Sequence, residues 1–437
     1  MLTDAPSDPA IWDGAAETMP REQLASLQLE RLRETVARVL NGQPLGAGRL
    51  ADAGISGADD ITTLDDLPNL PFAHKNDLRE HYPFGLLAVP RAEIVRVQAS
   101  SGSHGRPTVV GYTRDDLEIW TELMARSMTM AGVRPGMLIH NANGYGLFTG
   151  GLGFHQGGER IGATVVPVSG GQTARQAMLL KDFGAQVLVA TPSYSLVIAQ
   201  ALEDAGIAPE DNTLELGLFG GEPWTEGLRA KIDSALGIKA INFYGLSEMC
   251  GPGVASECLT ARDGLHVQED HFLVEVVDPA DGTPLPPNTD GELVFTTLTK
   301  EALPLIRYRT GDLGALAIEP CACGRTTARL IRLGGRLDDM LIIRGVNLYP
   351  SHIEQIMLSA DGVGPHYRLI LERPGPMDEL TLECEPSALD GHRDRLRQTL
   401  EKNLKEGTGV RITVSVVDPG TVPRSEGKAV RVVDRRQ

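Results

Sequence analysis

The 437-residue chain has little of what would assign a protein to a secreted or membrane class. Its five cysteines are unevenly spaced and do not form the framework of a disulfide-stapled domain, so a reducing cytoplasm is the expected setting. No apolar run approaches the roughly 20 residues that a membrane-spanning helix needs. The first residues also lack the basic and apolar segments of a signal peptide. We therefore expect a cytoplasmic protein with no membrane partner.

Positive charge is also scarce. The sequence has 41 lysines and arginines against 58 aspartates and glutamates, a net charge of −17. Because binding to a nucleic-acid backbone needs clustered lysine and arginine, this balance argues against a nucleic acid as the main partner. A hydrophobic content of 41% is ordinary for a globular protein, and the length favours more than one domain.

What the sequence does contain is an alternation of short β-branched runs and helical patterns. An amphipathic helix is expected at 21–40, and Thr113 is expected to cap a second helix. Strands are expected at 164–168, 187–190, 214–219 and 240–243. Helices are expected between them near 173–183, 193–205 and 226–235. This alternation predicts an α/β fold with a buried, largely parallel sheet and helices on both of its faces.

The pattern changes twice further along the chain. Strands joined by short turns are expected at 271–278, 291–297 and 313–318, which indicates an antiparallel or barrel-like part. Beyond about residue 338 the pattern becomes two helices and three strands, which indicates a small α+β domain. We therefore expect a large domain over 1–337 and a small domain over 338–437.

Residues 100–108 are a loop rich in glycine and hydroxyl groups between two apolar runs. Glycines allow a close backbone approach, and hydroxyl and amide groups donate to an anion, so the loop suits phosphate oxygens. The spacing of Gly102 and Gly105 is too short for a Walker P-loop. Such clusters are usually ordinary turns, so the loop alone is weak support for a phosphate site.

Later segments supply the other groups that a nucleotide site needs. The segment 244–248 follows a predicted strand and offers a ring for a base, a hydroxyl for phosphate and a carboxylate for Mg²⁺. Asp312, expected at a tight turn, suits the two hydroxyls of a ribose. The segments 335–345 and 423–428 follow, and the second of them ends in Lys428.

Taken in order, these segments resemble the adenylate-forming superfamily of acyl-CoA synthetases and adenylation domains. The sequences at 145–153, 222–224, 251–255 and 341–347 are most similar to its phenylacetate–CoA ligase branch. The resemblance implies ATP-dependent activation of an aromatic carboxylic acid as an acyl-adenylate, followed by transfer to coenzyme A with release of AMP and pyrophosphate. It also implies a mobile small domain and a homodimer.

The resemblance implies a role for each group of residues. The β- and γ-phosphates of ATP would be held by Ser100, Ser101, Gly102, Ser103, His104, Gly105 and Arg106. The rest of the nucleotide would be contacted by Gly220, Gly221, Glu222, Pro223, Tyr244, Gly245, Ser247, Asp312 and Arg336. Lys428 and Glu248 would be catalytic, the first at the carboxylate and α-phosphate, the second as a ligand of Mg²⁺. Asp338 would be the hinge between the domains.

Two residues of the phosphate loop depart from the family. The family usually has threonine where His104 stands and lysine where Arg106 stands. Arginine keeps the charge, whereas histidine loses a hydroxyl and titrates near neutral pH. The departures affect the details of phosphate contact rather than the use of ATP.

Four sulfur and nitrogen ligands form a candidate metal site. Cys321 and Cys323 are a tight pair, and Cys258 and His266 lie eight residues apart upstream. Three thiolates and an imidazole are the composition of a structural zinc site. The irregular spacing alone favours free buried cysteines. Some members of the branch carry zinc at matching positions, so the resemblance implies a structural zinc, with His271 as the alternative fourth ligand.

The acid pocket implied by the resemblance contains Asn143, Tyr145, Phe148, Gln156 and Gly221. Branch members often have an aromatic residue at position 143, tyrosine at 156 and alanine at 221. Unpaired buried amides cost about 1–3 kcal/mol, so two extra amides favour a ring with a polar substituent. We therefore expect a substituted benzoate such as an amino- or hydroxybenzoate, for example anthranilate, with phenylacetate close behind.

Two alternatives to a CoA ligase remain from the sequence: an adenylating enzyme with another acceptor, and a module without catalysis. A stand-alone adenylating enzyme would load the aryl acid onto a separate carrier protein, because this chain contains no carrier domain of its own. A non-catalytic nucleotide-binding module would transfer no acyl group, neither to coenzyme A nor to a carrier protein. Glu248, Asp312 and Lys428 are all present, which argues against the non-catalytic module.

Overall fold

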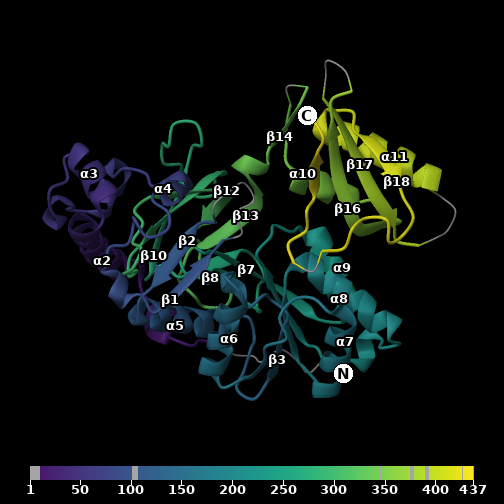
Figure 1. The fold of residues 1–437 in the computed structure, drawn as a ribbon, viewed down its shortest axis with the longest axis horizontal. Coiled ribbons are helices and arrows are strands. Elements are labelled where there is room, and N and C mark those ends of the chain that lie inside the picture. The colour runs from purple at the N-terminus through teal and green to yellow at the C-terminus, as the bar shows by residue number, and fades with distance from the viewer. Residues whose placement is uncertain are drawn as a thin grey trace.

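The computed structural model describes residues 10–100, 107–344, 346–374, 378–388, 393–425 and 427–436. They form a large body and a smaller C-terminal lobe (Figure 1). The lobe has a hydrophobic core of its own, whose buried residues run from Leu341 to Val414. The domain boundary expected after residue 337 falls within the short 3₁₀ turn η5 (Leu337–Asp339), between the last strand of the large body and the first strand of the lobe.

One sheet of eleven strands forms the centre of the large body. Its strand order is β10-β11-β12-β13-β9-β8-β7-β6-β5-β3-β4. The parallel strands are β3 (Leu138–Asn141), β4 (Thr164–Val166), β5 (Val187–Ala190), β6 (Leu216–Gly220) and β7 (Lys239–Leu246). The antiparallel strands are β8 (Gly251–Glu257), β9 (Leu265–Val267), β10 (Phe272–Val277), β11 (Gly291–Thr297), β12 (Tyr308–Ala317) and β13 (Arg329–Arg336). The predicted parallel sheet is confirmed, and the antiparallel part is its direct continuation, with the change of direction between β7 and β8.

Helices cover both faces of the parallel strands, as the alternation of elements predicts. Along β5, Val187 and Val189 pack in a core with residues of α5 (Arg114–Met130) and α6 (Thr149–Ile161). Leu188 and Ala190 point the other way, into a core with residues of α7, α8 and α9. Those helices span Thr173–Phe183, Pro192–Asp204 and Glu226–Leu236. Successive strand residues face opposite sides, so a strand that is apolar throughout is buried twice.

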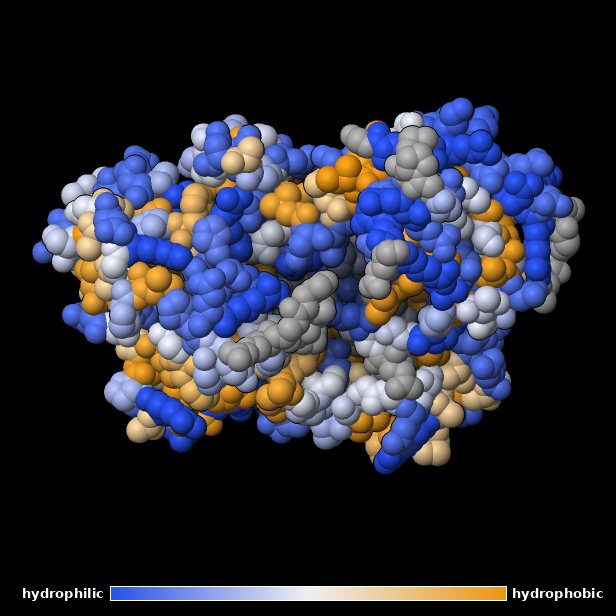
Figure 2. Space-filling view, turned by 45° about the horizontal axis from the view of Figure 1, so that its top comes forward, coloured by the Kyte–Doolittle hydropathy of each residue, from blue (hydrophilic) through white to orange (hydrophobic). Residues whose placement is uncertain are grey.

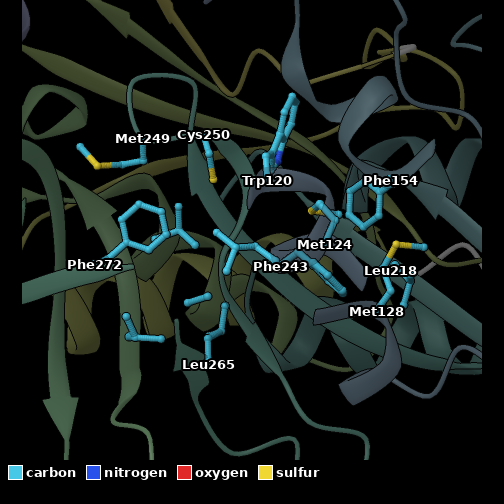
Figure 3. Packing of buried hydrophobic residues seen from close by; sticks show 14 of the residues in the cluster. Trp120, Met124, Met128, Phe154, Leu218, Phe243, Met249, Cys250, Leu265 and Phe272 are labelled. Atoms are coloured by element: carbon cyan, nitrogen blue, oxygen red, sulfur yellow. The ribbon is translucent and has the colours of Figure 1, made fainter. Parts of the chain in front are cut away.

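The core between the sheet and α5 and α6 reaches the start of the antiparallel part (Figure 3). Trp120 and Met124 of α5 lie beside Phe154 of α6 and Phe243 of β7. Met249 and Cys250, in the turn after β7, are buried in the same cluster. The turn that follows β7 is therefore anchored in a packed core.

Helix α6 was not expected from the sequence, because its glycines have poor helix propensity. The structure gives a steric reason for them. A Cβ on Gly157 would lie 2.6 Å from the Cβ of Met124, and one on Gly153 would lie 2.7 Å from the Trp120 ring. The glycines let α6 pack against α5 more closely than side chains would allow. Helix α5 itself begins at the expected cap, where the Thr113 hydroxyl accepts from the Asp116 N–H.

The N-terminal helices pack on the antiparallel part of the sheet. They are α1 (Gly14–Glu17), α2 (Arg21–Gly42), which confirms the helix expected at 21–40, and α3 (Pro44–Asp52). Leu32 and Val36 of α2 share a core with Leu273, Leu298 and Ile306. Shorter elements follow before α5: η1 (Ala58–Asp60), η2 (Leu64–Asn69), α4 (Lys75–Glu80), η3 (Arg91–Glu93), β1 (Arg96–Ala99) and β2 (Val109–Tyr112). A further 3₁₀ turn, η4 (Pro209–Asp211), connects α8 to β6.

The smaller lobe is the predicted α+β unit, with three strands that the sequence pattern did not indicate, β14, β15 and β19. Its elements are the hairpin β14 (Leu341–Ile343) and β15 (Val346–Leu348), then α10 (Pro350–Leu358), β16 (Val363–Glu372), β17 (Glu379–Pro386), α11 (Arg393–Thr408), β18 (Thr413–Val416) and β19 (Val432–Asp434). The last strand pairs parallel to β16 and completes the sheet order β18-β17-β16-β19. In the part of the chain that the structure describes, no helix combines the length and the apolar character needed to cross a membrane.

A buried ion pair joins the N-terminal segment to the far end of the large body. Arg325 Nε donates to Glu17 Oε2 at 2.6 Å, and the two side chains are each 2% exposed. The other Glu17 oxygen accepts from the backbone N–H groups of Trp12 and Asp13. Removing one partner of such a pair leaves a buried charge without compensation.

We expect Glu17→Ala to lower the free energy of unfolding of the large body by about 3–5 kcal/mol, because it leaves the Arg325 guanidinium buried and unpaired. The measurement is urea denaturation followed by tryptophan fluorescence. The control is Glu22→Ala, which removes an exposed carboxylate from the start of α2. An equal effect of the two substitutions would contradict the assignment.

Candidate active site

Several of the residues singled out in the sequence, Gly221 and Tyr244 among them, lie at one edge of the large body that faces the smaller lobe. Thr191 follows β5, Gly221 follows β6, and Tyr244 lies near the end of β7. Ligands bind at this edge of α/β sheets, outside the carboxyl ends of parallel strands. The surface between the large body and the lobe is hollowed and mainly hydrophilic (Figure 2).

A tyrosine, an aspartate and an arginine form a connected group on one side of this edge. The Tyr244 hydroxyl donates to Asp312 Oδ2 at 2.7 Å, and Arg336 lies 2.9 Å from Asp312 Oδ1. Burial raises the pKa of Asp312, and the Arg336 guanidinium opposes that shift. Burial and the Asp312 charge also raise the pKa of Tyr244 well above its ordinary value. The group can offer a carboxylate to hydroxyl donors while an arginine balances its charge.

The sequence suggested that Asp312 lies at a tight turn, and the structure shows that it does not. It lies inside the long strand β12, just after Gly311, whose φ is +75°. The pairing of β12 with β13 shifts register between Leu313 and Ala315. The strand is therefore irregular where it presents Asp312, and a run of residues that looks like a turn continues as a strand.

Glu248 supplies a second carboxylate. Its side chain is buried, and its Oε1 accepts from the Tyr308 hydroxyl at 3.2 Å. Ser247 is also buried, and its backbone carbonyl lies 3.4 Å from the Tyr112 hydroxyl. A carboxylate oxygen is the ligand type that Mg²⁺ prefers, so Glu248 fits the predicted role.

A buried lysine behind Glu248 was missed by sequence reasoning. Lys300 Nζ donates to the Met249 carbonyl at 2.6 Å and lies 4.3 Å from the centroid of the Tyr112 ring. The Tyr112 hydroxyl in turn donates to the Cys250 carbonyl at 3.1 Å. Burial lowers the pKa of Lys300, against the charges of Asp116 and other neighbouring groups. These bonds hold the backbone of the turn that carries Glu248.

The smaller lobe brings Lys428 to the same edge. Its Nζ lies 5.5 Å from the centroid of the Phe148 ring. A Cβ on Gly221 would lie 3.6 Å from Lys428 Cε and 3.7 Å from the Phe148 ring. The side chain keeps access to solvent, but the surrounding protein lowers its pKa by desolvation, and the charge of Glu222 opposes that shift. A lysine from one domain thus lies beside two residues of the other, Gly221 and Phe148, that were predicted for the acid pocket.

Three residues hold the backbone beside Lys428. The hydroxyls of Thr191 and Ser193 donate to the Gly427 carbonyl at 3.0 and 3.3 Å. Glu222 Oε2 accepts from the Ala429 N–H at 2.8 Å. Glu222 was expected along the nucleotide, and its carboxylate here binds the lobe. Thr191 and Ser193 were missed, although a hydroxyl pair directly after a predicted buried strand is a usable signal.

Two of the predicted nucleotide-contacting glycines lie where backbone segments approach each other. A Cβ on Gly220 would lie 2.2 Å from the Phe243 carbonyl oxygen, and one on Gly245 would lie 1.9 Å from the Gly251 carbonyl oxygen. Pro223 is exposed beside them. Only glycine fits at the first two positions, so they fix the shape of the edge whatever binds there.

The predicted acid-pocket residues divide into two groups. Asn143 is 8% exposed, and its Nδ2 would lie 3.4 Å from a Cβ on Gly150, which places it next to Phe148. The side chains of Tyr145 and Gln156 form hydrogen bonds with other protein groups. The Tyr145 hydroxyl accepts from Asn141 Nδ2 at 2.8 Å.

Gln156 has both ends of its amide in use. Its Oε1 accepts from the Arg96 guanidinium, and its Nε2 donates to the Thr121 hydroxyl at 3.1 Å. Both ends of this amide therefore already have protein partners. Of the two amides that favoured a polar ring substituent, Asn143 is the one that lies beside Phe148.

The phosphate loop lies largely outside the described residues. Ser101 to Arg106, which include His104 and Arg106, are not described. At the start of the loop, Ser100 N–H donates to the Thr108 carbonyl at 3.0 Å. The strands β1 and β2 pair antiparallel, with Ala99 opposite Val109, so the loop connects the two strands of a hairpin.

Asp338 lies on η5, where the chain passes from the large body to the lobe. Its Oδ1 accepts from Arg336 Nε at 2.9 Å. Burial acts to raise the pKa of Asp338, but the bond to Arg336 outweighs it and the pKa is lowered. The expected hinge residue is thus linked through Arg336 to Asp312.

The four metal-ligand candidates from the sequence come together in one buried cluster. The ligand atoms of Cys258, His266, Cys321 and Cys323 all lie within 4.8 Å of one another. The Sγ atoms of Cys258 and Cys321 are 3.8 Å apart, and Cys323 Sγ lies 3.4 Å from His266 Nε2. Two sulfurs bound tetrahedrally to zinc at about 2.3 Å are separated by about 3.8 Å. The donor set and its spacing therefore fit zinc.

Nearby groups favour the thiolate form of two of these residues, Cys321 and Cys323, whereas the pKa values of the Cys258 thiol and the His266 imidazole are raised. A hydrogen bond from Cys258, and then the neighbouring His266, lowers the pKa of Cys323 to about 2. The other ring nitrogen of His266 lies 3.0 Å from the Thr327 hydroxyl, which orients the ring. The alternative ligand was wrong, because His271 contacts Thr299 and Asp270 and is not part of the cluster.

The sequence and structure of this chain are similar to those of acid–CoA ligases. The AMP-binding enzyme family matches residues 88–298, and the AMP-binding enzyme C-terminal domain family matches residues 345–436. A phenylacetate–coenzyme A ligase of Thermus thermophilus is 50% identical over 96% of this chain and 98% of its own length. The phenylacetate–coenzyme A ligase of Escherichia coli K12 is 46% identical over 100% and 99%.

A solved structure extends the similarity to the arrangement of the domains. A 2-hydroxyisobutyryl-CoA ligase in its postadenylation state, 31% identical, matches with a TM-score of 0.92 over 100% of this chain and 94% of its own. The same ligase in its thioesterification state, bound to its adenylate and CoA, matches with a TM-score of 0.73. The chain belongs to the adenylate-forming superfamily of AMP-binding enzymes. Within it, the chain is a member of the phenylacetate–coenzyme A ligase branch, and so an AMP-forming acid–CoA ligase.

Proposed function

We propose that this enzyme converts phenylacetate, ATP and coenzyme A into phenylacetyl-CoA, AMP and pyrophosphate. The observation that carries the proposal is the position of Lys428, which reaches from the smaller lobe to Gly221 and Phe148. Similarity to phenylacetate–CoA ligases over nearly the whole chain supports the acid and the acceptor.

In the first half-reaction a carboxylate oxygen attacks the α-phosphorus of ATP, and the bond to pyrophosphate breaks. Two anions must approach each other, so cationic groups at the site lower the barrier. Lys428 would neutralise charge at the carboxylate and α-phosphate. Asp312 would accept from ribose hydroxyls, with Arg336 balancing its charge, and Tyr244 would lie against the base.

Glu248 would hold Mg²⁺. The ion would supply positive charge to the phosphate oxygens. Tyr308 and the bonds from Lys300 and Tyr112 to the neighbouring backbone keep this carboxylate in place.

In the second half-reaction the thiol of CoA attacks the acyl carbon of the adenylate, and AMP leaves. We propose that the smaller lobe rotates about Asp338 between the two steps. The lower TM-score against the thioesterification state of the 2-hydroxyisobutyryl-CoA ligase supports such a rotation, because the same relative fits much better in its postadenylation state. The arrangement of this structure would thus serve adenylation.

The proposed acid replaces the substituted benzoate favoured by the sequence. The relatives of 46–50% identity are phenylacetate–CoA ligases. The amide of Gln156, one of the two that suggested a polar substituent, is bonded to Arg96 and Thr121. Asn143 remains as a polar group beside Phe148, so a ring-substituted phenylacetate is a secondary candidate.

We also propose a structural zinc at Cys258, His266, Cys321 and Cys323. Support comes from the four donors, their burial and their spacing. A closed set of four protein ligands is typical of zinc that stabilises a fold rather than acts on a substrate.

The acid can be identified with a panel of phenylacetate, 4-hydroxyphenylacetate, benzoate, anthranilate and 2-hydroxyisobutyrate, each with and without CoA. We expect kcat/KM for phenylacetate to exceed that for benzoate by at least tenfold, since one methylene in an apolar pocket is worth about 10- to 200-fold. Release of AMP rather than ADP checks the reaction type. A preference for anthranilate would restore the substituted benzoate, and thioester formation only on a carrier protein would replace CoA as acceptor.

Lys428→Ala should reduce acyl-adenylate formation by about 100-fold or more, because the variant loses the cation at the carboxylate and α-phosphate. Thioester formation from supplied phenylacetyl-adenylate and CoA should stay within a fewfold of the unaltered enzyme. The two steps are measured by pyrophosphate release and by thioester absorbance. Equal loss in both steps would refute the role given to Lys428.

The zinc site predicts about one zinc per chain by elemental analysis of the purified enzyme. Cys321→Ser should lose the metal and lower the apparent Tm, because an uncompensated cluster of buried thiols and an imidazole remains. Cys384→Ala alters a buried thiol of the lobe and should keep the metal. A zinc-free enzyme that gains no stability from added zinc would contradict the site.

A further inference from the structure

The carboxylate of Glu222 accepts hydrogen bonds from both domains, next to Lys428. Its Oε1 accepts from the backbone N–H of Ser193 at 2.6 Å and from the Ser193 hydroxyl. Its Oε2 accepts from the N–H of Ala429 at 2.8 Å. One carboxylate thus bonds the first turn of α8 in the large body and the residue that follows Lys428 in the lobe.

The backbone on the other side of Lys428 is held as well. The Gly427 carbonyl accepts from the hydroxyls of Thr191 and Ser193. Thr191, Ser193 and Glu222 follow the neighbouring parallel strands β5 and β6, so the sheet fixes their separation. We call these three residues the lysine seat. The seat binds the peptide groups before and after Lys428 and leaves its side chain free to point toward Gly221 and Phe148.

Glu222 is well suited to this place. A carboxylate at the first turn of a helix is stabilised by the free N–H groups and by the helix dipole, and α8 has 13 residues. A charged acceptor also makes stronger bonds to N–H groups than a neutral one. The negative charge of Glu222 favours the protonated form of Lys428, against the desolvation that lowers its pKa.

We propose that Glu222 is a positioning residue for adenylation, which holds the Lys428 backbone in the lysine seat. The proposal rests on the proposed function, because it assumes that Lys428 acts in the first half-reaction. It also assigns the Glu222 side chain to the lobe rather than to the nucleotide. Bonds to the seat must break when the lobe rotates, so Glu222 acts in one half-reaction only.

The first test is Glu222→Gln, which keeps the size of the side chain and removes its charge. We expect single-turnover formation of phenylacetyl-adenylate to slow by about 10- to 100-fold, with the KM for ATP within about threefold. Thioester formation from supplied phenylacetyl-adenylate and CoA should change by less than about threefold. Ser193→Ala, which keeps the backbone bond to Glu222, should slow adenylation in the same direction but less.

The second test is the pH profile of adenylation. The other charged groups that face Lys428 are Lys75, Asp312, Arg336 and Asp339, and the substitution leaves them in place. Loss of the Glu222 charge removes a group that favours the ammonium, so the pKa of Lys428 should fall further. The alkaline limb of the adenylation rate should therefore move to lower pH in Glu222→Gln. A role in folding alone would not move this limb.

The matched control is Glu226→Gln. Glu226 lies four residues further on, at the start of α9, and its side chain is 80% exposed. It carries the same charge but contacts neither the lobe segment nor Lys428 among the described residues. We expect adenylation within twofold of the unaltered enzyme and an unchanged pH profile.

The outcomes separate this inference from the proposed function. The inference is overturned if Glu222→Gln impairs both half-reactions equally, raises only the KM for ATP, or leaves adenylation and its pH profile unchanged while Lys428→Ala abolishes adenylation. If the unaltered enzyme forms no adenylate with any acid of the panel, the proposed function fails and the inference with it. Slower adenylation with a shifted alkaline limb and normal thioester formation supports both.

Discussion

Repulsion between anions is the constraint on which the arrangement of this molecule depends. A carboxylate has to approach a triphosphate, and both carry negative charge, so the site must supply cations without filling the space that the substrates need. Under the proposed function, that supply is divided between two bodies. Arg336 lies at the junction, and Lys428 extends from the lobe. When a site is formed by two bodies, movement of one body can change the groups that the site presents. The proposed second half-reaction, thioester formation, requires such a change.

Much of the fold could be predicted from the sequence because the parallel strands follow a simple rule. Strands buried on both faces are apolar throughout, and the segment of β5, Val187–Ala190, illustrates this. Helix α6 could not be predicted, since its glycines lower helix propensity and their benefit appears only when Trp120 and Met124 of another helix are in place. Strand β12 was misread near Asp312 because a glycine at positive φ looks like a turn even when strand pairing continues beyond it.

The site was predictable to a different degree for different residues. Tyr244, Asp312 and Arg336 form the group that their order along the chain had suggested, and the four zinc-ligand candidates meet in one cluster. Ser193 was missed: its place after a predicted strand was a signal, but the sequence does not show that its partner Gly427 lies 234 residues away in the other domain. The amide of Gln156 was misjudged for the same reason: a sequence shows that an amide is present, but not that Arg96 and Thr121 already use it.

The ion pair between Glu17 and Arg325 has a consequence for the order in which the chain can fold during its synthesis. Glu17 leaves the ribosome early, but its partner follows 308 residues later. Until Arg325 is made, the Glu17 carboxylate of α1 lacks the guanidinium with which it pairs. Arg325 belongs to the same short segment as Cys321 and Cys323. A nascent chain therefore closes the N-terminal segment, the thiol cluster and the end of the large body together, before the lobe that carries Lys428 has been made.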